Sequence, residues 1–200
     1  MVGYRLSTYG NPLRTEPARK PGRYHTGEED SPTQYICLHP LGPLAEFMRA
    51  NDVRLPEQVR QVRQRTWALR LEIDGLPEIT LSTASDFGLD ATSLVDEDPN
   101  GCQALGRRLR DEGPGIVVPS AALPGTRNVV LFGPRVGSPY LIDPIGTVDL
   151  PSSITAHAAR PILSLLDVVR FKGEPHAQLE ALSRGEEFEF DEPDWELTRG

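Results

Sequence analysis

The side chains that most often carry chemistry are present in this chain, but they do not stand in the common catalytic motifs. The four histidines lack metal-ligand spacing such as HExxH, and the two cysteines do not form a CxxC pair. No serine lies within a GxSxG turn, and there is neither a Walker A loop nor a GxGxxG motif after a strand. A zinc enzyme, an α/β-hydrolase, a P-loop nucleotide hydrolase and a Rossmann dehydrogenase are therefore disfavoured.

What remains is a series of short segments in which a reactive or ligand-binding side chain stands beside strand-like or helix-like residues. In chain order they are Tyr4-Arg5-Leu6; Gly22-Arg23-Tyr24-His25; Gln34-Tyr35-Ile36-Cys37-Leu38 followed by Ala45-Glu46-Phe47; and Val118-Pro119-Ser120-Ala121 followed by Asn128-Val129-Val130-Leu131-Phe132. Taken singly, Arg23 is interpreted as a solvated loop residue, Glu46 as a surface charge and Ser120 as a turn residue. Their joint order favours a functional site.

In this order the segments resemble the RES domain, a family named for an Arg, a Glu and a Ser. The matching positions are Arg23, Glu46 and Ser120, and the resemblance covers roughly residues 4 to 172. Its most specific parts are the Ser120 segment with the strand after it and the strand–helix that carries Glu46. The family usually reads closer to GGRWN where this chain has PGRYHTG, so Tyr24 replaces a Trp and His25 replaces an Asn.

The resemblance implies a fold and an NAD⁺ site similar to those of ADP-ribosyltransferases. Many RES proteins are toxins of bacterial toxin–antitoxin pairs that deplete NAD⁺ by hydrolysis or phosphorolysis, and the partner is typically an Xre-type, DNA-binding antitoxin that plugs the active site. We therefore expect NAD⁺ as the substrate, water or inorganic phosphate as the acceptor, and no further cofactor or metal. A protein ADP-ribosyltransferase on the same fold and a non-catalytic binding module are the alternatives.

The chemistry of the nicotinamide–ribose bond gives the family positions specific roles. Cleavage passes through an oxocarbenium-like ribose, which a nearby carboxylate stabilises, and this role is assigned to Glu46. A guanidinium binds a diphosphate bidentately, so Arg23 is the candidate for the diphosphate, with Arg5 as its helper.

Three neighbouring side-chain types complete the expected site. An aromatic face suits the flat, cationic nicotinamide, and Tyr24 or Tyr35 would provide it. Ser120 is expected to hydrogen-bond a ribose hydroxyl or the amide, and Asn128 to orient Ser120 or the ligand.

Composition sets the class of protein. With 200 residues, 38% hydrophobic and 25% charged, the chain suits one soluble domain with a full-sized core. A net charge of −8 disfavours nucleic-acid binding, which needs a basic surface. No apolar run approaches the roughly 18 residues of a membrane span, and the N-terminus lacks the pattern of a secretory signal, so we expect a cytoplasmic protein. Cys37 and Cys102 are expected as buried free thiols.

Hydrophobic patterning predicts short elements that alternate along the chain. Strands are expected at 4–6, 34–38, 66–73, 115–120, 128–132 and 140–143, and helices at 44–50 and 100–112, while 162–169 is ambiguous. The predicted fold class is α+β, a single domain of short mixed strands and helices, ADP-ribosyltransferase-like by the resemblance. Residues 1–172 are predicted to form the RES-like NAD-binding catalytic domain and residues 173–200 an acidic C-terminal tail.

Overall fold

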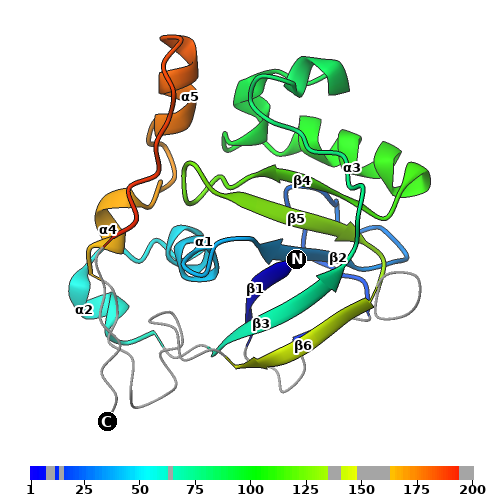
Figure 1. Ribbon diagram of the computed structural model, residues 1–200, viewed down its shortest axis with the longest axis horizontal. Coiled ribbons are helices and arrows are strands. Elements are labelled where there is room, and N and C mark those ends of the chain that lie inside the picture. The colour runs from blue at the N-terminus through cyan, green and yellow to red at the C-terminus, as the bar shows by residue number, and fades with distance from the viewer. Residues whose placement is uncertain (8–11, 14–15, 63–64, 135–140, 148–162, 194–200) are drawn as a thin grey trace.

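A six-stranded antiparallel sheet forms the centre of the molecule (Figure 1). The computed structural model describes residues 1–7, 12–13, 16–62, 65–134, 141–147 and 163–193. The sheet has the order β4-β5-β2-β1-β3-β6. Its strands are β1 (Val2–Ser7), β2 (Thr33–Cys37), β3 (Arg65–Glu72), β4 (Gly115–Pro119), β5 (Arg127–Phe132) and β6 (Leu141–Thr147).

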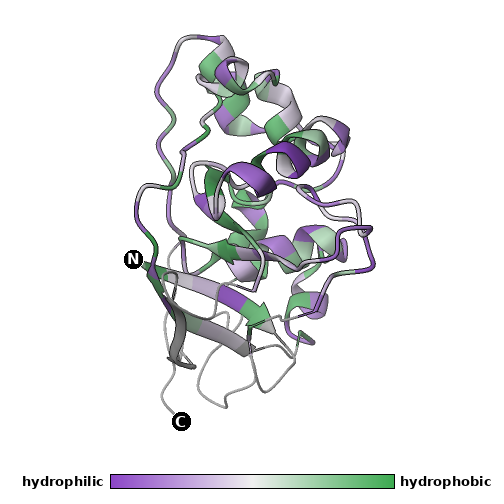
Figure 2. Cartoon of the chain, turned by 90° about the vertical axis from the view of Figure 1, so that its right-hand side faces the viewer, coloured by the Kyte–Doolittle hydropathy of each residue, from purple (hydrophilic) through white to green (hydrophobic). Residues whose placement is uncertain are grey.

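Helices lie around one half of this sheet. They are α1 (Gly42–Ala50), α2 (Pro56–Val59), α3 (Asn100–Glu112), α4 (Leu165–Val168) and α5 (Ala177–Ser183), with the 3₁₀ turns η1 (Ala84–Phe87) and η2 (Ala91–Leu94). In Figure 1, α3 and the 3₁₀ turns lie above β4 and β5, whereas α1, α2 and α4 lie to the left of the strands. The helices carry hydrophilic and hydrophobic residues side by side, as surface helices do (Figure 2). Among the described residues, no helix is long and apolar enough to cross a membrane.

The apolar runs of β4 and β5 are buried on both faces of the sheet. Because side chains alternate along a strand, Ile116 and Val118 pack in one core with Leu105 and Leu109 of α3. Val117, between them, joins a second core on the other face. This double burial explains why these segments read as continuous apolar runs rather than as alternating ones.

A third core holds α1 in place. Leu44 and Met48 are fully buried and pack with Ala122 and Leu123 of the β4–β5 turn and with Val169 after α4. A helix with these two residues one turn apart on its buried side has a fixed rotation about its axis. The rotation of α1 therefore decides which of its polar residues face the sheet.

The α+β class is confirmed, as are most of the expected elements. Helix 100–112 has the predicted bounds, and β4 and β5 form the predicted hairpin. The helix predicted at 44–50 begins at Gly42, with Pro43 in its first turn, where proline is favoured. The ambiguous segment 162–169 contains α4, and β6 covers most of the last predicted strand, whose first residue, Tyr140, lies outside the described residues. Both cysteines are buried and free, as expected.

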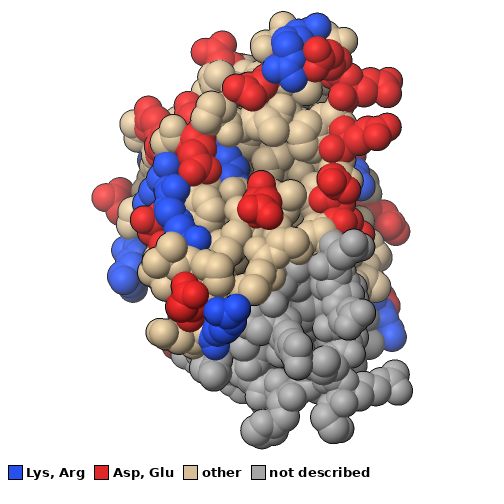
Figure 3. Space-filling view, turned by 90° about the vertical axis from the view of Figure 1, so that its left-hand side faces the viewer, with Lys and Arg blue, Asp and Glu red and all other residues tan. Residues whose placement is uncertain are grey.

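The described part of the predicted acidic tail is structured. Residues 177–183 form α5, and the amide N–H of Gly125 donates to Gln178 Oε1 over 3.1 Å. Further along, the Phe190 ring packs on the α1 core and meets the His39 ring edge-on. On the side of the molecule that includes α5, acidic side chains are widespread and basic ones lie in several separate groups among them, so that side carries no continuous basic surface (Figure 3).

Candidate active site

A cavity of about 720 Å³ lies where α1, the sheet and the loop around residues 21–24 meet. Its floor is one face of the sheet. Tyr35 and Cys37 of β2 are paired with Val130 and Asn128 of β5, and Asn128 is paired in turn with Val118 of β4. All five residues line the cavity. The period of two along each strand therefore brings them to one face, although they come from three strands.

Glu46 reaches the cavity from the second turn of α1. Its Oε1 accepts two hydrogen bonds, one from Ser120 Oγ over 3.0 Å and one from Asn128 Nδ2 over 2.9 Å. Both donors are neutral and come from the β4–β5 hairpin. The structure thus brings together three of the residues that the sequence singled out and fixes the orientation of the carboxylate.

Ser120 lies behind Glu46. Its side chain is 0% exposed, and its Oγ accepts the backbone N–H groups of Ala122 (3.3 Å) and Leu123 (3.1 Å). Because those two donors occupy the oxygen, the hydroxyl proton is directed at Glu46 Oε1. In this geometry Ser120 and Asn128 position the carboxylate, and the expected bond from Ser120 to a ribose hydroxyl or the amide stays a prediction.

Arg23 lines the cavity opposite α1 and is held by the backbone before α3. Its Nη1 donates to the Ser93 carbonyl over 3.3 Å, and its Nη2 donates to the Asp96 carbonyl. Next to it, Gln103 of α3 donates to the Gly22 carbonyl over 2.9 Å. These contacts tie the loop to α3 and give the guanidinium a fixed direction.

The two candidate tyrosines play different parts. The Tyr24 side chain is 1% exposed and packs in the α3 core, where burial raises its pKa well above the usual value. Although Tyr24 borders the cavity, this burial leaves little of its ring open for the expected stacking. Tyr35 is only partly buried at the cavity wall and keeps that possibility.

His25 takes a structural role in the same loop. Its Nε2 lies 2.9 Å from the Lys20 carbonyl and its Nδ1 lies 2.9 Å from the Tyr35 hydroxyl. A carbonyl only accepts, so Nε2 carries the proton and Nδ1 accepts from the hydroxyl. The hydroxyl oxygen also accepts the Tyr24 N–H over 2.9 Å. His25 thus fixes the Tyr35 ring beside the cavity.

Arg5 does not point toward Glu46. Its Nη1 donates to Gln34 Oε1 over 3.0 Å. Alternation along β1 and β2 places Tyr4 and Tyr35 on the cavity face, and Arg5 and Gln34 on the opposite face. Arg5 borders the cavity, but the direction of its guanidinium gives no support to its predicted role as a second diphosphate ligand.

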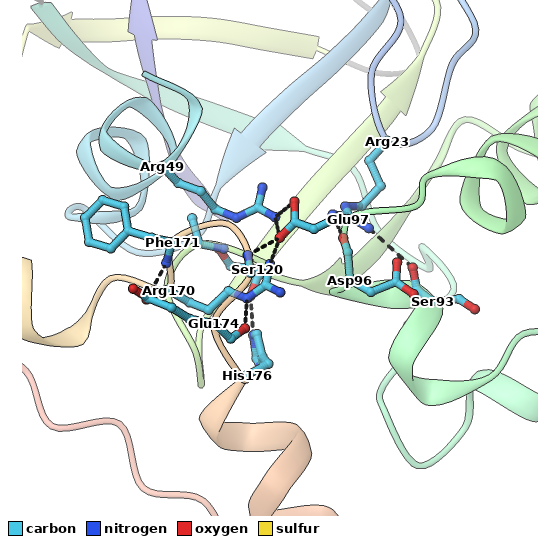
Figure 4. A network of polar contacts seen from close by, with 12 residues as sticks. Arg23, Arg49, Ser93, Asp96, Glu97, Ser120, Arg170, Phe171, Glu174 and His176 are labelled. Atoms are coloured by element: carbon cyan, nitrogen blue, oxygen red, sulfur yellow. Dashed lines mark hydrogen bonds and ion pairs between the residues drawn. The ribbon is translucent and has the colours of Figure 1, made fainter. Parts of the chain in front are cut away.

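A charged cluster beside Glu46 was missed from the sequence (Figure 4). Arg49 Nη2 donates to both oxygens of Glu97, over 3.0 and 2.9 Å, and Arg170 Nη1 donates to Glu97 Oε1 over 2.6 Å. Arg49, Glu97 and Lys172 line the cavity. The spacing of Glu46 and Arg49, three residues apart on one helix, was the available signal, because such residues share a face.

His176 is hydrogen-bonded to the loop that carries Ser120. It is buried, and its Nε2 donates to the Ser120 carbonyl over 3.1 Å, while Nδ1 has no partner among the described residues. Burial lowers its pKa to about 4, and the cations Arg170, Arg49 and Arg23 act in the same direction. A neutral His176 therefore ties the segment before α5 to the loop that carries Ser120.

Comparison with known proteins identifies the family. The chain matches the RES domain over residues 4–151. It belongs to the RES-domain family. A probable NAD(+) phosphorylase of Mycobacterium tuberculosis (strain ATCC 25618 / H37Rv) is 31% identical over 118 residues, which make up 58% of this chain and 56% of that relative. This RES chain therefore matches little more than half of the relative's length.

The fold has a solved counterpart. The crystal structure of the M. tuberculosis MbcT–MbcA toxin–antitoxin complex contains a chain that superposes with a TM-score of 0.64 at 20% identity. The superposition covers 77% of this RES chain and 86% of the other chain. At this identity the likeness concerns the fold.

The segment beyond the RES match contributes to the site. The match ends at residue 151, yet Lys172 lines the cavity, Arg170 binds Glu97 and His176 holds the Ser120 loop. The segment 170–176 is thus part of the candidate site in this RES protein.

Proposed function

We propose that this RES protein cleaves the bond between nicotinamide and ribose in NAD⁺ and acts as an NAD⁺-depleting toxin. The observation that carries the proposal is the Glu46 carboxylate, which Ser120 and Asn128 hold at the wall of a cavity that Arg23 and Arg49 also line. The family match and the name of the M. tuberculosis relative support the same substrate.

The arrangement suits a dissociative cleavage. As the C1′–N bond breaks, its electron pair goes to the nicotinamide ring, which leaves as a neutral molecule and needs no strong acid. Positive charge develops on the ribose, where the preorganised carboxylate of Glu46 stabilises it more than it stabilises the ground state. A cavity of about 720 Å³ is within the usual range for a small-molecule site, and the guanidinium of Arg23 is available at its rim for the diphosphate.

Inorganic phosphate or water then attacks C1′. The name of the relative, a probable NAD(+) phosphorylase, supports phosphate as the acceptor. We propose phosphorolysis as the principal reaction, with ADP-ribose 1″-phosphate as the second product and hydrolysis as the competing path.

The release of free nicotinamide from NAD⁺ is the measurement that tests the proposal. Purified protein is incubated with NAD⁺, with and without phosphate, next to the variant Glu46→Gln as the catalytic control. We expect release by the wild type, faster in phosphate, and a loss of about 100-fold or more in the variant, because a neutral amide cannot balance the oxocarbenium charge. Absence of release under both conditions from folded protein refutes the proposal. Label from ADP-ribose on macromolecules would instead indicate a protein ADP-ribosyltransferase.

We further propose that an antitoxin of the Xre type covers this cavity. The support is the solved neighbour, which is part of a toxin–antitoxin complex, together with the family resemblance. Co-expression with a small helix-turn-helix protein from an adjacent reading frame should restore growth, and the purified complex should release no nicotinamide.

A further inference from the structure

The pair Arg49 and Arg170 is enclosed by the fold and shares one exposed carboxylate. The Arg49 side chain is 12% exposed and that of Arg170 is 8% exposed, whereas Glu97, to which both donate, is 41% exposed. Taking two guanidinium groups out of water is costly unless anions compensate them. A single half-exposed carboxylate on the loop before α3 compensates only part of that charge.

The charge around this pair is unbalanced toward the positive. Four cationic residues line the cavity, Arg5, Arg23, Arg49 and Lys172, with only Glu46 and Glu97 as described acidic residues in its wall. Arg170, which binds Glu97, adds a fifth cation, and His176 is neutral because burial holds its pKa at about 4. The excess of positive charge suits an anion with more than one negative charge.

The donors around Glu97 form a cradle for oxygen atoms. Glu97 Oε1 receives Arg49 Nη2, Arg170 Nη1 and the backbone N–H of Gly173, the last over 3.4 Å. Figure 4 shows that the two arginines approach this carboxylate from different elements. Guanidinium groups and backbone N–H groups are the donors that bind phosphoryl oxygens. Arg49 Nε, buried and without a partner among the described residues, is a further donor of the same group.

We propose that Arg49, Arg170 and the Gly173 N–H form a phosphoryl subsite, in which the Glu97 carboxylate is a built-in competitor that a phosphoryl group displaces. The assignment rests on the proposed function for its biological meaning, since the phosphoryl group comes either from the dinucleotide's diphosphate or from the phosphate acceptor. Arg49 lies one helical turn from Glu46, so an anion held here is adjacent to the reacting ribose.

Binding of inorganic phosphate tests the subsite without any turnover. Calorimetric titration at constant ionic strength compares the wild type with Glu97→Gln, which keeps the side-chain shape and removes the competing charge. We expect Glu97→Gln to bind phosphate at least 10-fold more tightly. The matched control is Glu186→Gln, which removes an exposed carboxylate paired with the exposed Arg184 just after α5. Its affinity for phosphate should equal that of the wild type.

Replacement of the arginine donors should reverse the gain in phosphate affinity. Arg170→Lys in the Glu97→Gln background should lose most of it, because an ammonium cannot present two N–H groups in a fork. If this double variant unfolds, Arg49→Lys in the same background provides the same test. Equal phosphate affinity in the wild type and Glu97→Gln would overturn the subsite, as would a gain that both lysine variants retain.

Addition of ADP-ribose distinguishes the two sources of the phosphoryl group. Phosphate that ADP-ribose displaces assigns the subsite to the diphosphate, and phosphate that binds together with ADP-ribose assigns it to the acceptor. Both results require the subsite. Tighter phosphate binding by Glu97→Gln in a protein that never releases nicotinamide would leave the subsite standing and refute the proposed reaction alone.

Discussion

At the scale of single residues, the positions of Ser120 and Glu46 indicate different roles for the two side chains. The serine oxygen accepts two backbone N–H groups and its proton is directed to the carboxylate. A hydroxyl that is fully buried and whose oxygen already accepts two N–H groups is poorly placed to attack a substrate. In the proposed reaction Glu46 is the group that meets the ribose, and Ser120 sets the direction of its carboxylate.

Substitution of Ser120 by Ala tests this positioning role. The variant leaves two buried N–H groups without their acceptor, so we expect the free energy of unfolding to fall by about 1–3 kcal/mol. It also removes a hydrogen bond that orients the Glu46 carboxylate, so kcat for nicotinamide release should fall by roughly 10-fold with little change in KM. Ser183→Ala, at an exposed hydroxyl of α5, is the control. An unchanged kcat in folded Ser120→Ala would contradict the role.

At the scale of elements, helix α3 and the Arg23 loop are in backbone contact. A Cβ at Gly106 would collide with the carbonyl oxygen of Tyr24, so glycine is required for this approach. Gly106→Ala should therefore lower the free energy of unfolding by about 1–3 kcal/mol, although alanine is the better helix former. Gly101→Ala in the same helix meets only the end of the Leu89 side chain and should cost less. Chemical denaturation measures both, and equal stability of the two variants would contradict the close packing.

The segment before α5 makes stability depend on pH. Burial lowers the pKa of His176 to about 4, so between about pH 6.5 and pH 4 the unfolded chain binds a proton that the folded protein does not. The stabilisation is present above pH 6.5 and is lost as the pH falls through this window, by up to about 3 kcal/mol at about 1.4 kcal/mol per pKa unit.

Two other titratable groups, His39 and Glu29, also make stability depend on pH. Burial also lowers the pKa of His39, which acts in the same window. The desolvation of Glu29 opposes ionisation, but N–H bonds from Thr26 and Gly27 outweigh it and lower its pKa to about 2, so its effect falls below about pH 4.5. The free energy of unfolding of His176→Gln, measured at pH 7 and pH 5, isolates the contribution of His176, since glutamine keeps a donor for the Ser120 carbonyl. The free energy of unfolding should fall less between these pH values than it does in the wild type. An equal fall would exclude His176 as the source of the pH dependence.

At the scale of the whole molecule, the cavity is assembled from the sheet, α1, the Arg23 loop and Lys172. A ligand that contacts all of them binds only the folded state. ADP-ribose, which has the diphosphate but no nicotinamide, should therefore raise the melting temperature, with a stabilisation of about 2.7 kcal/mol at 100 times its Kd. The same shift should be much smaller in Arg23→Ala, and an equal shift would remove Arg23 from the diphosphate role.

Local patterns in the sequence determined the elements and predicted several of the residues that line the cavity. Periods of two and 3.6, with glycine and proline at the boundaries, depend on neighbours a few residues away, and they predicted β4, β5 and the bounds of α3. The ordered segments around Arg23, Glu46 and Ser120 were enough to indicate the family.

Only the tertiary structure decided how those residues are used. Ser120 meets Glu46 across 74 positions, and Arg170 meets Glu97 across 73. Such contacts depend on the strand order and on the rotation of α1, which no local pattern records. The same packing turned the Tyr24 ring into the core, directed Arg5 to the far face of the sheet and brought Arg49 and Arg170 to one carboxylate. The physical reason is that burial and the pairing of charges are properties of residues that the chain brings together, not of residues that follow one another along it.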